Sequence, residues 1–151
     1  MTEIKQQEQI TEQGNPSKPE GIAGAEMLTR MNESHAGVTE WGLSHFEWQG
    51  NEQVLDIGCG GGATLHRMSA HIGSAGHLTG LDYSAVSVAE SQLFNEADVK
   101  AGKMEVMAGS VENLPFADGT FDKITTVESF YFWPDPAQNL REVRRVLRAG
   151  G

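Results

Sequence analysis

A short apolar run breaks abruptly into glycines in Val54-Leu55-Asp56-Ile57-Gly58-Cys59-Gly60-Gly61-Gly62. Its apolar residues are typical of a strand that a parallel sheet buries on both faces. Glycines let the backbone turn tightly and approach a ligand closely, and we expect a helix to begin at about Ala63. A strand, a glycine loop and a helix are the opening of a nucleotide-binding βαβ unit. The loop alone does not identify the ligand, because Gly58, Gly60 and Ala63 also fit the dinucleotide fingerprint.

Asp56 narrows the choice of ligand. Its carboxylate comes two residues before the first glycine, and we expect it at the mouth of the loop, where it would repel a pyrophosphate. It would attract an ammonium or sulfonium group, and S-adenosylmethionine carries both. The alternative is that Asp56 only accepts hydrogen bonds from loop amides.

This loop resembles the first motif of the class I S-adenosylmethionine-dependent methyltransferases. From about Met27 to Gly151 the chain is similar, more narrowly, to the ubiquinone/menaquinone-biosynthesis type of these enzymes. The resemblance implies a Rossmann-like α/β sheet with helices on both faces. It also implies a methyltransferase that uses S-adenosyl-L-methionine as its cofactor and a small organic molecule as the methyl acceptor.

Composition limits the partners of the chain. The 11 Lys and Arg residues against 21 Asp and Glu residues give a net charge of −10, so we expect no nucleic-acid partner.

Cys59 is the single cysteine, which rules out an intrachain disulfide framework. A nucleophilic role for Cys59 is the alternative to a small residue that the loop needs for steric reasons. No apolar run is long enough to span a membrane, and we expect a cytoplasmic protein without a metal site.

Three regions are predicted along the chain. Residues 1–20 are polar, with Pro16 and Pro19, and we expect a disordered tail. Residues 21–50 are amphipathic and predict two short helices, at about 25–32 and 38–46, and residues 51–151 are the core domain. The resemblance implies that the helical segment covers the cofactor pocket. The residues that could then face the cofactor or the acceptor are Met31, Asn32, His35 and Trp41, and the alternative for the Met and Trp side chains is core packing.

Residues 78–82 predict the second strand, which ends at Asp82. This carboxylate follows the last loop glycine by about 20 residues, the spacing at which an acidic side chain meets the ribose hydroxyls of a bound nucleoside. The alternative is that Asp82 is only the N-cap of the next helix, which we expect from Ser84 to about Asp98. Tyr83 either stacks on adenine or packs outward. The same features fit a nicotinamide-dependent oxidoreductase, which is the enzyme alternative.

The third and fourth strands are predicted at residues 104–108 and 121–127. The resemblance implies that Ser110 and Val111, after the third strand, hold the adenine, although an aspartate is commoner than a serine there. It places Glu128 and the aromatic residues after it beside the methionine moiety and the acceptor. The residues assigned to the cofactor are Asp56, Gly58, Cys59, Gly60, Asp82, Tyr83, Ser110, Val111 and Glu128. His35 and Tyr131 are the candidates for a general base.

Asp135 and Pro136 predict the start of the last helix, which we expect to end at Gly150. A complete class I fold has further strands after this helix, so we expect an incomplete sheet of the first four strands, in the order 3-2-1-4. The fourth strand would then be an uncovered edge. We expect a fragment of a longer protein or, failing that, a homodimer through this edge. A non-catalytic module that binds the cofactor or a partner protein is the alternative to an enzyme.

Overall fold

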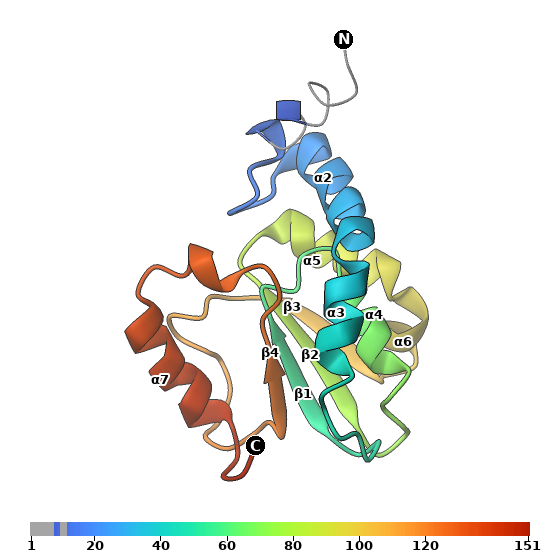
Figure 1. Cartoon of the computed structure of the whole chain (residues 1–151), viewed down its shortest axis with the longest axis vertical. Helices are drawn as coiled ribbons and strands as arrows, with labels where there is room; N and C mark the ends of the chain where they lie inside the picture. Colours follow the sequence, from blue (N-terminus) through green and yellow to red (C-terminus); the bar gives the residue numbers. More distant parts are fainter. Residues whose placement is uncertain (1–7, 10–11) are drawn as a thin grey trace.

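Four parallel strands form the centre of the molecule, a computed structural model that describes residues 8–9 and 12–151. They are β1 (Gln53–Ile57), β2 (His77–Asp82), β3 (Met104–Ala108) and β4 (Lys123–Thr125), and their spatial order is β3-β2-β1-β4. Both the predicted fold class and the predicted strand order are confirmed (Figure 1).

The strands separate two apolar cores, one on each face of the sheet. Val54 belongs to one core and Leu55 to the other, as expected because successive side chains of a strand point to opposite faces. Helices α3 (Ala36–Leu43), α4 (Ala63–Ser69), α5 (Ala85–Phe94) and α6 (Glu96–Lys100) cover the first face, and α7 (Pro136–Val146) covers the second (Figure 1). Cover on both faces leaves every residue from Val54 to Ile57 of β1 buried.

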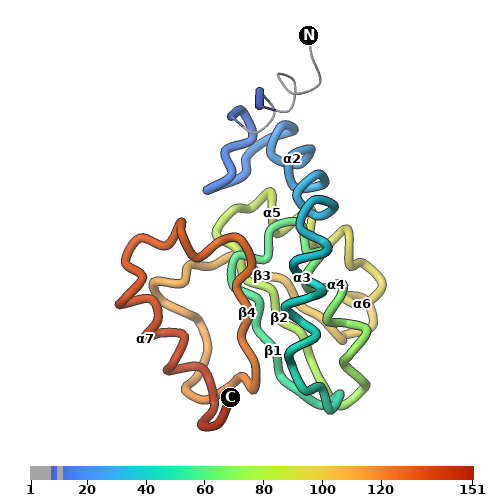
Figure 2. Tube along the Cα trace, viewed as in Figure 1, coloured from blue at the N-terminus to red at the C-terminus, as the bar shows by residue number. Residues whose placement is uncertain are grey.

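Helix α2 (Gly21–Ser34) and the segment before it lie beyond the carboxyl ends of the strands (Figure 2). Its buried residues Met27 and Leu28 pack it onto the domain, and α2 contacts α5. Helices α2 and α3 are separated at His35, one residue before the predicted break. The arrangement places a helical layer above the glycine loop.

Two predicted elements are shorter than the sequence pattern suggested. The predicted strand 121–127 pairs with β1 only over Lys123–Thr125, because Ser129 Oγ donates a 3.0 Å hydrogen bond to the carbonyl of Ile57 and turns the chain across the end of β1. The predicted helix 84–98 is divided at Asn95, whose side chain donates to the carbonyls of Gly62 and Ser91. In both cases a side-chain hydrogen bond to a distant backbone group competes with the regular ladder.

The last helix also ends earlier than expected, at Val146. The amide of Phe121 donates to the carbonyl of Val146, and the amide of Arg148 donates to the carbonyl of Phe121. This extended pairing replaces the final helical turn. Leu140, on this helix, is 48% exposed.

Strand β4 pairs with β1 on one side, and its other side pairs with no strand in the described part of the chain. The homodimer through this edge stays a prediction. Among residues 8–9 and 12–151, none of the helices has the length and apolar character that a membrane crossing requires.

Candidate functional site

The glycine loop is fixed to the end of β2 by backbone hydrogen bonds. The amides of Gly58 and Cys59 both donate to the carbonyl of Leu81, over 2.7 and 3.1 Å. Gly58 has a φ of +72°, and a Cβ at this position would lie 2.6 Å from the Cβ of Ser129. A glycine is therefore required at Gly58 both by its conformation and by its close approach to Ser129.

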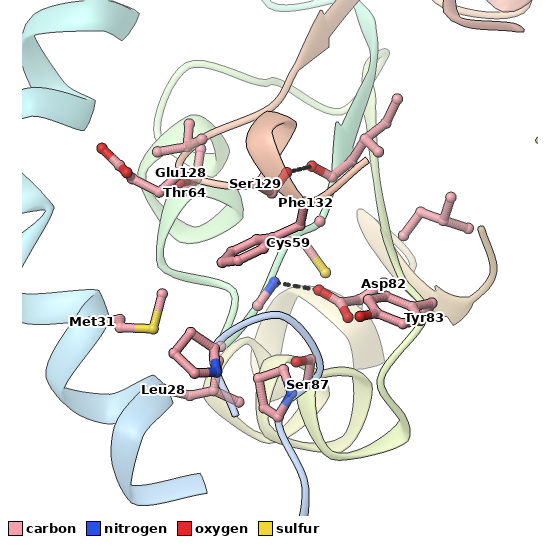
Figure 3. Close-up of a pocket in the computed structure, with 18 of the residues that line it drawn as sticks. Leu28, Met31, Cys59, Thr64, Asp82, Tyr83, Ser87, Glu128, Ser129 and Phe132 are labelled. Carbon is pink, nitrogen blue, oxygen red and sulfur yellow. Dashed lines mark hydrogen bonds between the residues drawn. The ribbon is translucent and has the colours of Figure 1, made fainter. Parts of the chain in front are cut away.

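Asp82 joins the same loop to the start of α5. Its Oδ2 accepts a 3.0 Å hydrogen bond from the amide of Gly60 (Figure 3). Its Oδ1 accepts one of 2.9 Å from the amide of Ser84. The N-cap of α5 is Ser84, whose hydroxyl accepts from the amide of Ser87. Asp82 is thus not the cap of this helix. A carboxylate has about four lone-pair positions, so its oxygens can accept further hydrogen bonds from a ligand.

A cavity lies at the carboxyl ends of the strands and brings most of the predicted residues together. The cofactor candidates that line it are Gly58, Cys59, Gly60, Asp82, Tyr83, Ser110, Val111 and Glu128, and Met31, Asn32 and His35 line it from the α2–α3 segment. Asp56, Trp41 and Tyr131 are not among its lining residues. Trp41 is 68% exposed on α3, so it faces neither the core nor the cavity.

Asp56 lies behind the loop and not at its mouth. Its side chain is on the same face of β1 as Val54 and is fully buried, and the hydroxyl of Thr125 donates a 2.6 Å hydrogen bond to its Oδ1. Burial is the main reason why the pKa of Asp56 is raised to about 7, and the charge of Asp82 adds to it. The residue therefore lies in the core below the loop and not among the residues that line the cavity.

The Cys59 thiol is an unsuitable nucleophile. The side chain is buried, and a Cβ at Gly80 would come within 3.1 Å of its sulfur. Burial raises the pKa of Cys59 well above its usual value, and the carboxyls of Asp56 and Asp82 raise it further. Because the thiolate is the reactive form, the structure favours the steric explanation for a small residue here.

Ser110 and Val111 form the floor of the cavity after β3. The Ser110 hydroxyl donates to Glu112 Oε2 over 3.1 Å and accepts from the amide of Glu112 over 3.2 Å. The Val111 side chain is buried below it. This small turn, after the end of β3, contributes Ser110, Val111 and Glu112 to the lining of the cavity.

Glu128 stands at the end of β4 with a φ of +52°, a left-handed conformation that is uncommon for a residue with a side chain. The hydroxyl of Tyr131, in the 3₁₀ helix η1 (Phe130–Phe132), donates a 2.6 Å hydrogen bond to Glu128 Oε2. This hydrogen bond is the main cause that raises the pKa of Tyr131 to about 12. Tyr131 is also 63% exposed, so of the two general-base candidates only His35 lines the cavity.

The expected tail contributes to the site through residues 16–19, which we call the N-terminal strap. Pro16, Ser17 and Pro19 line the cavity. The Tyr83 hydroxyl donates to the carbonyl of Ser17, the Ser84 hydroxyl donates to the carbonyl of Pro19, and the Lys18 ammonium lies 5.5 Å from the centre of the Tyr83 ring. The sequence held no signal for these contacts, because the strap is polar and has no apolar periodicity.

Two further residues that sequence reasoning missed line the cavity from α4. Thr64 and Arg67 are three residues apart and therefore on one side of the helix. Figure 3 shows Thr64, with Glu128, on the side of the cavity away from Asp82 and Tyr83. The cavity therefore has two ends, one between β2 and β3 and one between α4 and β4.

A family model described as a methyltransferase domain matches residues 55–151. A demethylmenaquinone methyltransferase of Listeria welshimeri is 38% identical over 105 residues, which are 68% of this chain and 43% of that protein. The chain thus spans less than half the length of this relative.

Two solved structures share the fold. One chain of the complex between the Haloferax volcanii Trm112 methyltransferase activator and a putative methyltransferase matches with a TM-score of 0.75 and 26% identity, over 82% of this chain and 53% of that one. A putative S-adenosyl-L-methionine-dependent methyltransferase of Methanococcus maripaludis matches with a TM-score of 0.68 and 26% identity, over 84% of this chain and 60% of that one.

Proposed function

Since the chain belongs to the methyltransferase domain family, as a class I S-adenosylmethionine-dependent methyltransferase of the ubiquinone/menaquinone-biosynthesis type, we propose that the whole protein methylates a small organic molecule. The demethylmenaquinone methyltransferase of Listeria welshimeri, named for a quinone, supports an organic acceptor of this class. The family also decides against a nicotinamide-dependent oxidoreductase.

The observation that carries the proposal is the position of the Asp82 carboxylate against the glycine loop. It lies within 3.0 Å of the Gly60 amide and lines the cavity at the end of β2, where a ribose diol would find two acceptor oxygens. The glycine at position 58 permits the close approach of Ser129 that holds the loop against the end of β4. The residues present therefore fit the nucleoside part of S-adenosylmethionine, with the base toward Ser110 and Val111.

The cofactor supplies a methyl group already activated on a sulfonium. The task of the protein is then to hold the acceptor in line with this methyl group, a positioning effect that accounts for a large part of such rate enhancements. Phe132 and Trp133 line the cavity beyond β4, and aromatic walls suit a flat organic acceptor. His35 is the residue proposed to take up a proton where the acceptor atom carries one.

Calorimetric titration of the chain with S-adenosylhomocysteine, with NADH as the comparison ligand, tests the proposal. We expect micromolar binding of S-adenosylhomocysteine and none of NADH. Transfer of a labelled methyl group from S-adenosylmethionine to reduced demethylmenaquinone, followed in the organic extract, then tests the acceptor class. Preference for NADH would contradict the proposal, and tight binding of S-adenosylhomocysteine without methyl transfer to any small acceptor would favour the non-catalytic module.

Deletion of residues 1–20 should weaken binding of S-adenosylhomocysteine by about tenfold, because the N-terminal strap forms one wall of the cavity and the deletion exposes apolar ligand surface. The Tyr83→Phe variant is the matched control. It keeps the ring and removes only the hydrogen bond to Ser17, so its loss should be smaller, on the order of 1 kcal/mol. Calorimetry measures both, and an unchanged affinity after the deletion would contradict a role for the strap.

A further inference from the structure

Three buried polar side chains follow one another along a single face of α5. They are Ser87, Ser91 and Asn95, each one turn of the helix after the last, and Ser87 and Ser91 are 0% exposed. Among residues 8–9 and 12–151, no partner forms a hydrogen bond with Ser87 Oγ, Ser91 Oγ or Asn95 Oδ1. Burying an unpaired polar atom costs free energy, so each of these atoms requires an explanation.

Packing against the glycine loop explains Ser91 and Asn95. A Cβ at Gly62 would lie 2.3 Å from Ser91 Oγ and 2.5 Å from Asn95 Nδ2. The Asn95 side chain also donates a 3.0 Å hydrogen bond to the carbonyl of Gly62. The loop therefore approaches α5 too closely for larger side chains at these two positions. Neither residue is among those that line the cavity.

Ser87 differs from the other two because it lines the cavity. Figure 3 shows it below Asp82 and Tyr83, on the same side of the cavity. Burial raises the pKa of Asp82, and the Ser87 hydroxyl opposes this rise together with the amides of Ser84 and Gly60. The hydroxyl thus lies near the Asp82 carboxylate, yet it forms no regular hydrogen bond with any described residue. A buried, unpaired hydroxyl that lines a cavity has its hydrogen-bonding capacity available for a ligand.

We infer that Ser87 is a specificity residue for a ribonucleoside, with its hydroxyl donating to the oxygen of a ribose hydroxyl that itself donates to Asp82. The inference rests on the proposed function, in which the Asp82 carboxylate accepts from the ribose. A hydroxyl group donates one hydrogen bond and accepts others, so one ribose hydroxyl can bond with both side chains. A deoxyribose would leave the Ser87 hydroxyl unpaired, and a site with an unpaired buried polar group discriminates against such a ligand.

Calorimetry with S-adenosylhomocysteine and its 2′-deoxy and 3′-deoxy analogues tests the contact. The parent should bind S-adenosylhomocysteine more tightly than at least one analogue, by roughly a hundredfold, because that analogue loses its bonds to both side chains. Ser87→Ala should lower this preference by about tenfold and leave the binding of the same analogue nearly unchanged. Ser91→Ala is the matched control, since it removes an equally buried and unpaired hydroxyl from the same face of α5. It should keep the preference of the parent.

Urea unfolding separates a ligand contact from a structural role of Ser87. Without ligand, the midpoint for Ser87→Ala should be at least as high as that of the parent, because the hydroxyl has no partner to lose and alanine favours a helix more than serine does. Added S-adenosylhomocysteine should raise the midpoint less in the variant than in the parent. A lower midpoint without ligand, or an unchanged preference for the ribose in Ser87→Ala, would overturn the inference and leave the proposed function standing. A parent that binds none of these nucleosides would contradict both.

Discussion

Asp82→Ala should lower the affinity for S-adenosylhomocysteine by about a hundredfold. The substitution removes the acceptors proposed for the ribose hydroxyls, and charge-assisted hydrogen bonds of this kind contribute about 1.5 to 3 kcal/mol. It also frees the amides of Gly60 and Ser84, which the carboxylate now holds at 3.0 and 2.9 Å. The glycine loop then loses its link to the start of α5, so the ligand meets a less organised site. Calorimetric titration of the folded variant measures the effect.

Two variants separate the loss of the carboxylate from a general loss of structure. Asp82→Asn keeps one carbonyl oxygen for a loop amide and should lose about tenfold, less than the alanine variant. Asp118→Ala removes an exposed carboxylate that pairs with Arg145 and should bind like the parent. Equal binding by the parent and Asp82→Ala would contradict the assignment of this residue to the cofactor.

The pH dependence of binding provides a second measurement on the same residue. Burial raises the pKa of Asp82 above its ordinary value, while the amides of Ser84 and Gly60 oppose the shift. As the pH falls through this raised pKa, the carboxylate gains a proton and one of its acceptor positions becomes a donor. We therefore expect the affinity of the parent for S-adenosylhomocysteine to fall on acidification, and that of Asp82→Asn to change less over the same range.

The features that the sequence predicted correctly are those encoded locally. The apolar runs of β1, β2 and β3, the turn at Gly58 and the cap at Ser84 each depend on residues close together in the chain. The strand order followed from the resemblance. Asp82 was found by its spacing from the loop, because the length of one helix and one turn brings the ends of neighbouring parallel strands together.

The features that escaped prediction depend on contacts between distant parts of the chain. The N-terminal strap is fixed by Tyr83 and Ser84, which are more than sixty residues away, and Arg67 reaches the cavity from a helix whose apolar stripe gave no sign of a ligand. The direction of Asp56 is a different case. The alternation of side chains along a strand places Asp56 on the same face of β1 as Val54. Helices cover that face, so the Asp56 side chain lies in the core and not in the cavity, and the sequence alone does not show this.

In the Asp56→Asn variant, the free energy of unfolding should fall less with rising pH than in the parent, and the difference should amount to several kcal/mol. The pKa of Asp56 is raised from 3.8 in the unfolded reference to about 7 in the folded chain, so the folded state binds the proton more tightly. The stability that this proton contributes is complete below about pH 4 and is lost as the pH rises toward 7, at about 1.4 kcal/mol per pH unit. Asparagine has no such proton to lose. Urea unfolding at pH 5 and pH 8 measures the free energy of unfolding of both chains.

Between these two pH values the parent should lose about 3 kcal/mol relative to the Asp56→Asn variant. The variant keeps a carbonyl oxygen for the Thr125 hydroxyl, which now donates to Asp56 Oδ1 over 2.6 Å, so the comparison isolates the ionisation. Asp118→Asn, at a largely exposed side chain, should follow the parent at both pH values. Parallel pH profiles for the parent and Asp56→Asn would show that Asp56 is ionised in the folded chain at neutral pH. The neutral carboxyl beneath the glycine loop would then have to be abandoned, while the raised pKa of Cys59 would stand, because burial is its main cause and an ionised Asp56 raises it further.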